Sequence, residues 1–413
     1  MPFLVQRRKS RKHLAGASAI LAICSATPNA NALEPSDFLV FSKGPFSLRP
    51  QLYATTEYND NVLYRKTNVV GDLINTISPG LRMLLGEDLP EANHVLFEYF
   101  LDQSWYLDQD ELNATQHRIR LTGQYSTGRT TISGTDRIDF LSTTLGGGFS
   151  AAGRKVDRTV FSDLYRLEYR VGQRTEVYGE IEHGAVDYEN GITLFDSRTL
   201  QGTLGFGWRY SEDSRIFGEI YYGQTELQSN FSPTDPPGKT FVGGFIGARG
   251  KFTEKLSGLV KAGYEVNEFD RTAAFAATEA GSSPVVEASL VFQATERTSL
   301  ELDYSRRQRI SVEFATSAYT SDEVSLSGRV ILGQTGRLRL NAGASYGNYA
   351  YEPSVFYATR TDTILSGRVG ASWFFETWLF ARLQYEYSNY SSDLPQLIDY
   401  TQNRVTLGVG IGF

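Results

Sequence analysis

The sequence predicts an all-β fold, a closed antiparallel transmembrane β-barrel of about 18 strands. Three observations predict it. From residue 45 onward, apolar side chains recur at every second position in stretches of about ten residues. The stretches are separated by breaks that alternate between short and long. The chain also combines 24 Tyr and 25 Phe with a mean hydropathy of −0.29, as a sheet with one apolar and one polar face requires.

The alternation has a period of two residues, which indicates strands whose two faces meet different environments. It is clearest in the last strand, which carries one set on each face: Val405, Leu407, Val409, Ile411 and Phe413 on the first, and Arg404, Thr406, Gly408, Gly410 and Gly412 on the second. The stretches 324–332 and 338–346 repeat the pattern. Helical spacing explains none of the three.

The breaks indicate how many strands there are and which way each one runs. Eight are short, near 89–90, 127–128, 172–173, 211–213, 253–254, 295–296, 335–336 and 376–377. Nine are longer and polar, at 60–70, 107–112, 145–158, 190–196, 229–239, 271–283, 314–320, 353–359 and 393–398. Together they predict about 18 strands with short periplasmic turns and long extracellular loops.

Two other β architectures would also alternate. A soluble sandwich or propeller usually has shorter strands, and its outward positions are charged, whereas here they are Leu, Val, Tyr and Phe. A β-helix would show short repeats of fixed period, and the sequence has none. The alternating loop lengths and the aromatic content favour the transmembrane barrel.

The first 32 residues are expected to be a signal peptide. A basic head that includes Arg7 and Lys12 precedes a modestly apolar stretch, and Ala30-Asn31-Ala32 resembles a cleavage site. A lipoprotein signal ending at Cys24 is the less favoured alternative, because bulky Ile23 precedes that cysteine. We expect residues 33–45 to form a periplasmic segment, as an extension or a plug, and residues 46–413 to form the barrel.

Removing the signal peptide changes the charge and the cysteine content of the chain. The mature chain has 35 Lys and Arg against 47 Asp and Glu, a net charge of −12, and no cysteine. An exported chain without cysteine is not a disulfide-stabilised scaffold. The negative charge argues against nucleic acid as a partner.

Aromatic residues near the strand ends predict two interfacial belts. Trp208, Trp373 and Trp378 lie close to short breaks and predict the inner belt. Tyrosines near the long breaks predict the outer belt: Tyr53, Tyr58, Tyr188, Tyr221, Tyr222, Tyr346, Tyr349, Tyr387 and Tyr390. The alternative is that tyrosine is simply a favourable strand residue.

At residues 58–62, 72–74 and 77–81 the chain resembles the putative β-barrel porin 2 family. The motifs are Tyr-Asn-Asp-Asn-Val, Asp-Leu-Ile and Ile-Ser-Pro-Gly-Leu. That family opens with a strand ending in a similar Asn-Asp-Asn-Val turn, followed by an Ile-Ser-Pro-Gly-Leu strand. The resemblance implies a bacterial outer-membrane barrel, often associated with exopolysaccharide production and export, and it carries no catalytic motif.

The C-terminus also resembles the β-signal of outer-membrane proteins, an alternating strand that ends in an aromatic residue. The expected partners are therefore outer-membrane lipid and the outer-membrane assembly machinery. The residues expected to be read by that machinery are Tyr400, Val405, Leu407, Val409, Ile411 and Phe413. The alternative is an ordinary strand that happens to end in Phe.

The sequence contains no pattern for catalysis, metal binding or a cofactor, so none of these is expected. The mature chain has three histidines, His94, His117 and His183, and no nucleophile or acid accompanies them in a known motif. No His or acidic cluster has the spacing of metal ligands.

The polar face of the strands is rich in arginine and is expected to line a water-filled lumen. The candidate selectivity residues are Arg166, Arg170, Arg209, Arg307, Arg309, Arg329, Arg337, Arg339, Arg368 and Arg382. Charged rings in a pore select ions by sign, so this wall favours anionic solutes, acidic sugars included. The alternative is that acids neutralise the arginines. A hairpin centred on 172–173 would place Arg170 opposite Glu176 and Arg166 opposite Glu180.

The expected function is therefore a porin-like channel that passes saccharides, exopolysaccharide or other anionic solutes. The first alternative is a non-conducting barrel that serves an envelope export system as a docking component. The second alternative is a barrel enzyme acting on lipid or polysaccharide.

Overall fold

The computed structural model describes residues 40–87, 92–146, 153–189, 194–229, 236, 238–270, 281–313, 318–353, 359–394 and 399–412. The expected signal peptide, residues 1–32, and the terminal Phe413 lie outside the described residues. Within the described part of the chain, no helix is long and apolar enough to cross a membrane.

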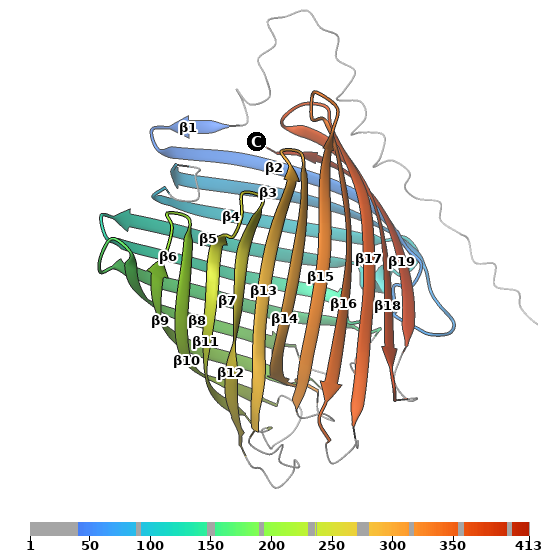
Figure 1. Cartoon of the computed structure of the whole chain (residues 1–413). Helices are drawn as coiled ribbons and strands as arrows, with labels where there is room; N and C mark the ends of the chain where they lie inside the picture. The colour runs from blue at the N-terminus through green and yellow to red at the C-terminus, as the bar shows by residue number, and fades with distance from the viewer. Residues whose placement is uncertain are drawn as a thin grey trace, which may run out of the picture.

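The described residues form strands almost exclusively (Figure 1). The elements in chain order are β1 (Phe41–Lys43), β2 (Phe46–Asn59), β3 (Asp72–Gly86), β4 (His94–Tyr106), the short 3-10 helix η2 (Asp110–Leu112), β5 (Ala114–Thr127), β6 (Thr130–Thr144), β7 (Lys155–Arg170), β8 (Thr175–Tyr188), β9 (Asp196–Arg209), β10 (Ser214–Gln228), β11 (Lys239–Lys251), β12 (Leu256–Phe269), β13 (Gly281–Thr295), β14 (Thr298–Ile310), β15 (Ala318–Leu332), β16 (Leu338–Tyr351), β17 (Arg360–Phe374), β18 (Leu379–Ser392) and β19 (Tyr400–Ile411).

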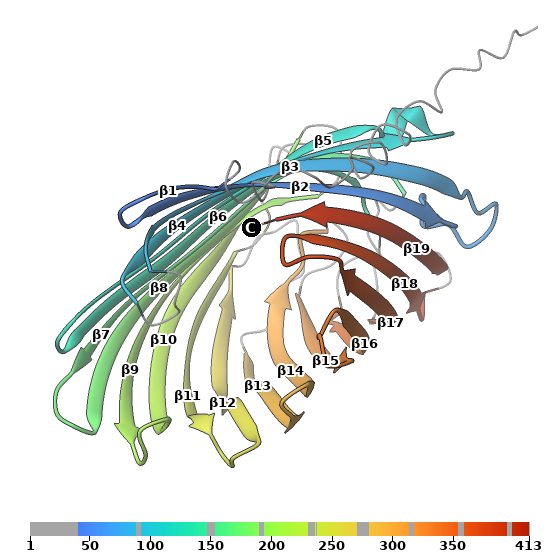
Figure 2. The same cartoon turned by 90° about the horizontal axis from the view of Figure 1, so that it is seen from above.

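The sheet closes on itself, because the last strand pairs with the second. In this antiparallel pair Arg404 of β19 lies opposite Asn59 of β2, and Ile411 lies opposite Leu52. Figure 2 shows β19 beside β2 at the seam. Strands β2–β19 therefore form a closed antiparallel barrel of 18 strands, as predicted. Closure leaves no unpaired strand edge in the membrane.

The short strand β1 stands outside this ring. Phe41 lies opposite Leu48 of β2, so residues 40–45 extend the first hairpin of the barrel. The turn of that hairpin contains Gly44 with φ +61°, a conformation that favours glycine. Residues 33–39 lie outside the described residues.

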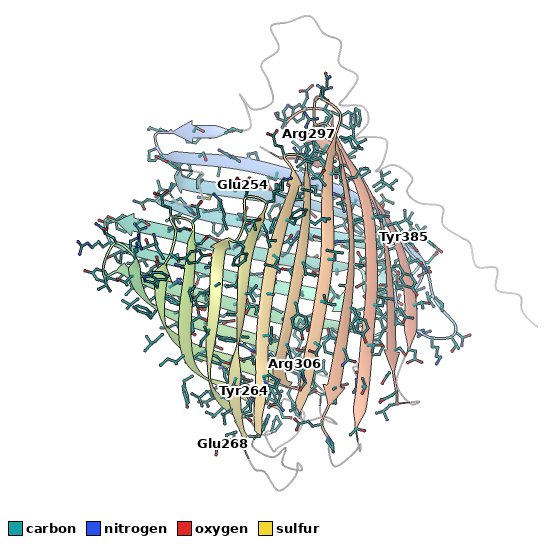
Figure 3. The ribbon with its side chains drawn as sticks, in the orientation of Figure 1. Glu254, Tyr264, Glu268, Arg297, Arg306 and Tyr385 are labelled. Atoms are coloured by element: carbon teal, nitrogen blue, oxygen red, sulfur yellow. The ribbon has the colours of Figure 1, made fainter. Side chains whose placement is uncertain are left out.

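The connections alternate as the sequence predicts, with eight turns at one end of the barrel and nine loops at the other; only the β3–β4 turn, residues 87–93, is as long as the shortest of these loops. Figure 3 shows Glu254 and Arg297, which lie in short turns, at the upper end, and Glu268 and Arg306, on strands leading to long loops, near the lower end. We call these the short-turn end and the long-loop end. In outer-membrane barrels they face the periplasm and the outside respectively.

The two faces of the wall differ as the period of two predicts. The outward positions carry large apolar side chains, such as Ile246, Ile220 and Leu204, which are 74%, 66% and 65% exposed. The inward positions carry polar and charged groups, and among them Glu176 of β8 and Glu265 of β12 are fully buried. The apolar face meets lipid, and the polar face surrounds the lumen.

The prediction of the outer aromatic belt is wrong for part of its tyrosines. Tyr221 and Tyr390 are 3% and 2% exposed, and with Tyr53, Tyr188 and Tyr349 they occupy inward positions. A position near a strand end sets the level of a residue in the membrane but not its face. Tyr58, Tyr222 and Tyr346 do lie on the outward face, as do Trp208 and Trp373 near the short turns.

Candidate functional site

The lumen is the candidate site, and one side of it is a network of ion pairs. Glu176 of β8 is fully buried and accepts hydrogen bonds from Arg209 of β9, at 2.9 Å, and from Arg215 of β10. Glu168 of β7 lies 3.5 Å from Arg209 and 3.4 Å from Arg215. We call this set, with Arg166 and Glu180, the ion-pair wall. Its three arginines and three glutamates neutralise one another.

The predicted hairpin register across 172–173 is confirmed. Arg166 lies opposite Glu180 and Arg170 opposite Glu176. The first pair is also an ion pair, with 3.3 Å between Nη1 and Oε2. The second is not, because Glu176 binds arginines from the two following strands instead of Arg170.

Two tyrosines lie flat against the inner wall because the neighbouring strand carries glycine there. Tyr178 lies directly opposite Gly205, where a Cβ atom would come within 2.1 Å of its ring. Tyr221 lies opposite Gly243, where a Cβ atom would lie 2.3 Å from its hydroxyl. Their hydroxyls donate to Glu219 and Glu265. Because Gly205 and Gly243 have no side chains, the two rings can lie along the wall, where their hydroxyls hydrogen-bond lumenal carboxylates.

The other side of the lumen is basic. A recess of about 410 Å³ on β14–β18 is lined by four arginines, Arg329, Arg339, Arg368 and Arg382, and by a single acid, Glu301. None of the four forms an ion pair with a carboxylate of the described residues. We call this set the arginine recess.

Neutral groups hold two of these arginines in place. The Nε atom of Arg382 donates to the hydroxyl of Ser372 over 3.3 Å. The guanidinium of Arg339 lies 4.1 Å from the ring centre of Phe374, a cation–π contact. Both contacts orient an arginine and leave its charge uncompensated.

The ion-pair wall and the arginine recess face each other across the lumen. The wall lies on β7–β10 and the recess on β14–β18, so three strands separate them on one side of the 18-strand barrel and six on the other. Both sites lie toward the short-turn end of the barrel. Glu176 and Arg209 lie at or next to the ends of their strands there, and Arg329 and Arg339 lie near the ends of theirs. At this level the charges of the ion-pair wall balance, Arg249 of β11, opposite Arg215, adds a positive charge beside the wall, and the recess is positive.

The ten arginines named from the sequence therefore differ in their surroundings. Arg166 and Arg209 belong to the ion-pair wall, and Arg307 lies 3.9 Å from Glu265. Arg329, Arg339, Arg368 and Arg382 line the recess, and Arg337 follows the turn beside it. Arg170 and Arg309 lie at the short-turn and long-loop ends of their strands. The alternation along each strand shows only that these arginines face the lumen. The cross-strand register decides which of them have a carboxylate within ion-pair distance.

The long-loop end contains buried charges that sequence reasoning missed. Arg360, at the start of β17, is 2% exposed and binds Asp362 of the same strand and Glu313 of the β14–β15 connection, the latter over 3.0 Å. The backbone of Glu313 also forms an isolated antiparallel β-bridge with Leu194 of the β8–β9 connection. No signal in the sequence links β17 with these two connections, because the contacts form only when the barrel closes.

Aromatic and apolar contacts continue this layer around the opening. Arg360 donates to the hydroxyl of Tyr390, which stacks on Tyr400 at 5.6 Å, and Tyr400 meets Tyr64 of the β2–β3 loop edge-on at 5.0 Å. Leu145, Val156 and Leu194 form a buried cluster with Tyr188 and Val312. We call the layer formed by 61–64, 145–146, 194–195, 312–313, Arg360, Tyr390 and Tyr400 the mouth layer. It joins loops from distant parts of the wall and narrows the opening.

The residues expected to guide assembly lie on different faces. Val405, Leu407 and Val409 point outward and are 43%, 56% and 39% exposed, and Ile411 shares their parity. Tyr400 lies on the opposite face, where it is buried in the mouth layer. Phe413 lies outside the described residues.

The three histidines after residue 32 lie far from the arginine recess. His94 hydrogen-bonds the carbonyl of Ala92 at the short-turn end, whereas His117 and His183 lie on the outward face. Among the described residues no group of three His, Cys, Asp or Glu side chains could hold a metal ion.

The comparison with protein families decides the identity of the chain. The family model described as "Putative beta-barrel porin 2" matches residues 196–413. The chain belongs to this family. It is thus a porin-like barrel channel of the outer membrane. The match begins at β9, so the segments between 58 and 81 that first resembled the family precede it.

Several solved outer-membrane proteins are similar to this chain at low identity. The outer membrane protein OpdK of Pseudomonas aeruginosa is 11% identical, with 89% of this chain and 99% of that chain covered and a TM-score of 0.46. OccAB3 of Acinetobacter baumannii is 12% identical, with the same coverage and a TM-score of 0.45. These similarities concern the fold alone. No curated protein matches the chain.

Replacing Glu176 with Gln should destabilise the barrel. The amide would leave Arg209 and Arg215 without their buried counter-charge, so we expect a loss of about 2 kcal/mol in the free energy of unfolding. Glu180→Gln is the matched control, because Glu180 is partly exposed and has one arginine partner. Urea unfolding in detergent measures both. Equal losses in the two variants would contradict the central role of Glu176.

The β2–β3 loop should loosen in acid. The Lys66 ammonium donates to Asp399 over 2.7 Å and holds the pKa of that carboxyl below its usual value. The link therefore stabilises the loop above the ordinary aspartate range, and it is lost as the pH falls through the lowered pKa. The gain is below about 1 kcal/mol, because Lys66 is largely exposed.

Hydrogen exchange of residues 61–66 should show this change, measured against Asp399→Asn at each pH. We expect the wild type to be better protected at pH 7 and to match the variant well below pH 3.8, the unperturbed aspartate value. Equal protection at pH 7 would show that the link is not formed.

Proposed function

We propose that the barrel is a channel for anionic solutes, acidic saccharides included. The unneutralised charge of the arginine recess carries this proposal. Opposite the ion-pair wall, four arginines face the water-filled lumen with Glu301 as the only acid among the residues that line them. An anion entering at this level meets the concentrated positive charge of the recess on one side and the largely balanced charges of the ion-pair wall on the other.

The other lining groups of the recess support an acidic sugar as the solute. A guanidinium binds a carboxylate through two parallel hydrogen bonds. Asn341, Gln384 and Ser372 offer hydrogen bonds to hydroxyl groups, and the ring of Phe374 offers an apolar face. The resemblance to a family often associated with exopolysaccharide export agrees with this solute class.

The mouth layer favours a second candidate, a barrel that docks export components and does not conduct. Buried contacts link the β2–β3, β8–β9 and β14–β15 connections with β17–β19, and they narrow the long-loop opening. In this candidate the arginine recess, toward the short-turn end, would bind an anionic component in place of a passing solute. Conductance separates the two functions.

Anion preference can be measured as a reversal potential under a salt gradient in planar bilayers. The variant Arg339→Gln/Arg368→Gln/Arg382→Gln should reduce the anion-to-cation permeability ratio. One charge about 4 Å from an ion in water is worth about 1 kcal/mol, roughly fivefold, before screening by salt. The double variant Arg166→Gln/Glu180→Gln keeps the net charge and should leave the ratio unchanged. Cation preference in the wild type would refute the proposal.

Removing the central arginine of the mouth layer should widen the channel. Arg360→Ala deletes the contacts with Glu313, Asp362 and Tyr390, so we expect a higher single-channel conductance than in the wild type. Lys251→Ala is the control, since Lys251 pairs with Asp213 at the surface of the short-turn end. No conductance in either the wild type or Arg360→Ala would favour the docking barrel.

A further inference from the structure

The outward face of three adjacent strands carries a cluster of titratable groups. Asp136 of β6 lies directly opposite Asp163 of β7, and Asp163 lies opposite His183 of β8. The Nδ1 atom of His183 is 3.4 Å from Asp163, and the hydroxyl of Tyr165 donates to Asp136. We call these four residues the outer polar patch.

The register places this patch on the lipid side of the wall. Tyr165 lies opposite Ile181, which is 56% exposed, and shares its face. It also packs over Gly134, where a Cβ atom would come within 2.8 Å of the ring. The opposite face of the same strands carries the lumenal pair Arg166–Glu180.

The patch lies inside the apolar band and not at its edge. Each of its residues is near the middle of its strand. Toward the short-turn end the next outward residues are Leu167 and Ile181, and toward the long-loop end they are Ile138 and Phe161. Ionisable groups at this depth are costly when they face lipid, and in membrane proteins they usually face protein or water.

The patch continues across two more strands. On β4 and β5 the hydroxyl of Tyr99 is 2.9 Å from Nδ1 of His117, and His117 packs edge-on against Phe140 of β6. Two of the three histidines after residue 32 thus lie on one outward region. Elsewhere the outward middle of the wall carries residues such as Leu204, Ile220, Leu326 and Leu407.

The groups of the patch are not all satisfied within the chain. The Oδ1 atom of Asp163 is buried and has no hydrogen-bond partner among the described residues. His183 packs edge-on against Phe161 and makes one hydrogen-bond contact, through Nδ1, which leaves Nε2 available. The surface near His183 does not project, because Gly202 of β9 has no side chain there. A Cβ atom at this position would meet nothing within 4 Å. The patch thus offers both a donor and an acceptor to a flat surface that approaches it.

We infer that the outer polar patch is the contact surface for a second copy of this chain. Copies inserted in the same orientation are related by an axis along the membrane normal, and a two-fold axis at β7 brings β8 of each copy alongside β6 of the other. The imidazole on one surface then approaches the carboxylates on the other. The same patch on both copies supplies both halves of the contact.

A polar cluster on the outward face of β14–β15 does not provide an alternative assembly. Arg306 and Tyr304 bind Asp322 there, toward the long-loop end, where Figure 3 shows Arg306. This cluster lies on β14–β15, seven strands from the outer polar patch in an 18-strand barrel. A contact between two such nearly opposite faces would extend from copy to copy without closing. A closed dimer needs only the outer polar patch.

Cysteine cross-linking tests the contact, because the chain has no cysteine beyond Cys24. Ile181→Cys places a thiol next to Tyr165, and Leu407→Cys places an equally exposed thiol, at 56%, on the far side of the barrel. In native outer membranes we expect a short bis-maleimide to convert the first variant to a dimer and to leave the second monomeric. The double variant Asp136→Leu/Asp163→Leu, combined with Ile181→Cys, should lose most of that dimer.

Heat-modifiable migration on gels shows whether each variant retains a folded barrel, and native mass spectrometry of the purified wild type should give twice the mass of one mature chain. Three results would overturn the inference: a monomeric mass together with no cross-link at 181, equal cross-linking at 181 and 407, or cross-linking of position 181 to a different protein. Reversal potentials should be unaffected by the Leu substitutions, so the channel proposal stands or falls separately.

Discussion

The pairing of β19 with β2 is the constraint on which the rest of the structure depends. A strand edge in hydrocarbon would leave backbone N–H and C=O groups without partners, so the sheet must close. Closure then couples all 18 strands in one register. The face of every side chain follows from that register, because a slip by one residue would turn an entire strand inside out.

The closed register sets the electrostatics of the lumen. Most charged residues of the barrel wall lie on its lumenal face, and the neighbouring side chains determine whether each charge is neutralised by an ion pair. On β7–β10 three arginines and three glutamates lie within ion-pair distance. On β15–β18 the corresponding positions are occupied by Ser, Asn, Gln and Gly, so the arginines there stay uncompensated. A channel whose uncompensated positive charge is concentrated on the side of the recess results from this distribution.

The ends and the outside of the barrel show features of a different kind. The mouth layer joins loops that leave the wall at widely separated strands, with Arg360 and Glu313 buried where they meet. The outer polar patch places carboxylates and an imidazole in the middle of an outward face that is mostly apolar. Both depart from the simple polar-inside, apolar-outside rule, and such departures mark sites where a contact or a function outweighs the cost of burying charge.

The sequence by itself determined the fold class, the strand number, the alternation of short turns and long loops, and the local pair Arg166–Glu180. These follow from period two and from hairpin geometry, which act over a few residues. Only the tertiary structure decided that Glu176 binds Arg209 and Arg215, that Tyr221 and Tyr390 face inward, and that Arg360 meets Glu313. These outcomes depend on contacts between segments far apart in the chain, and barrel closure brings those segments together.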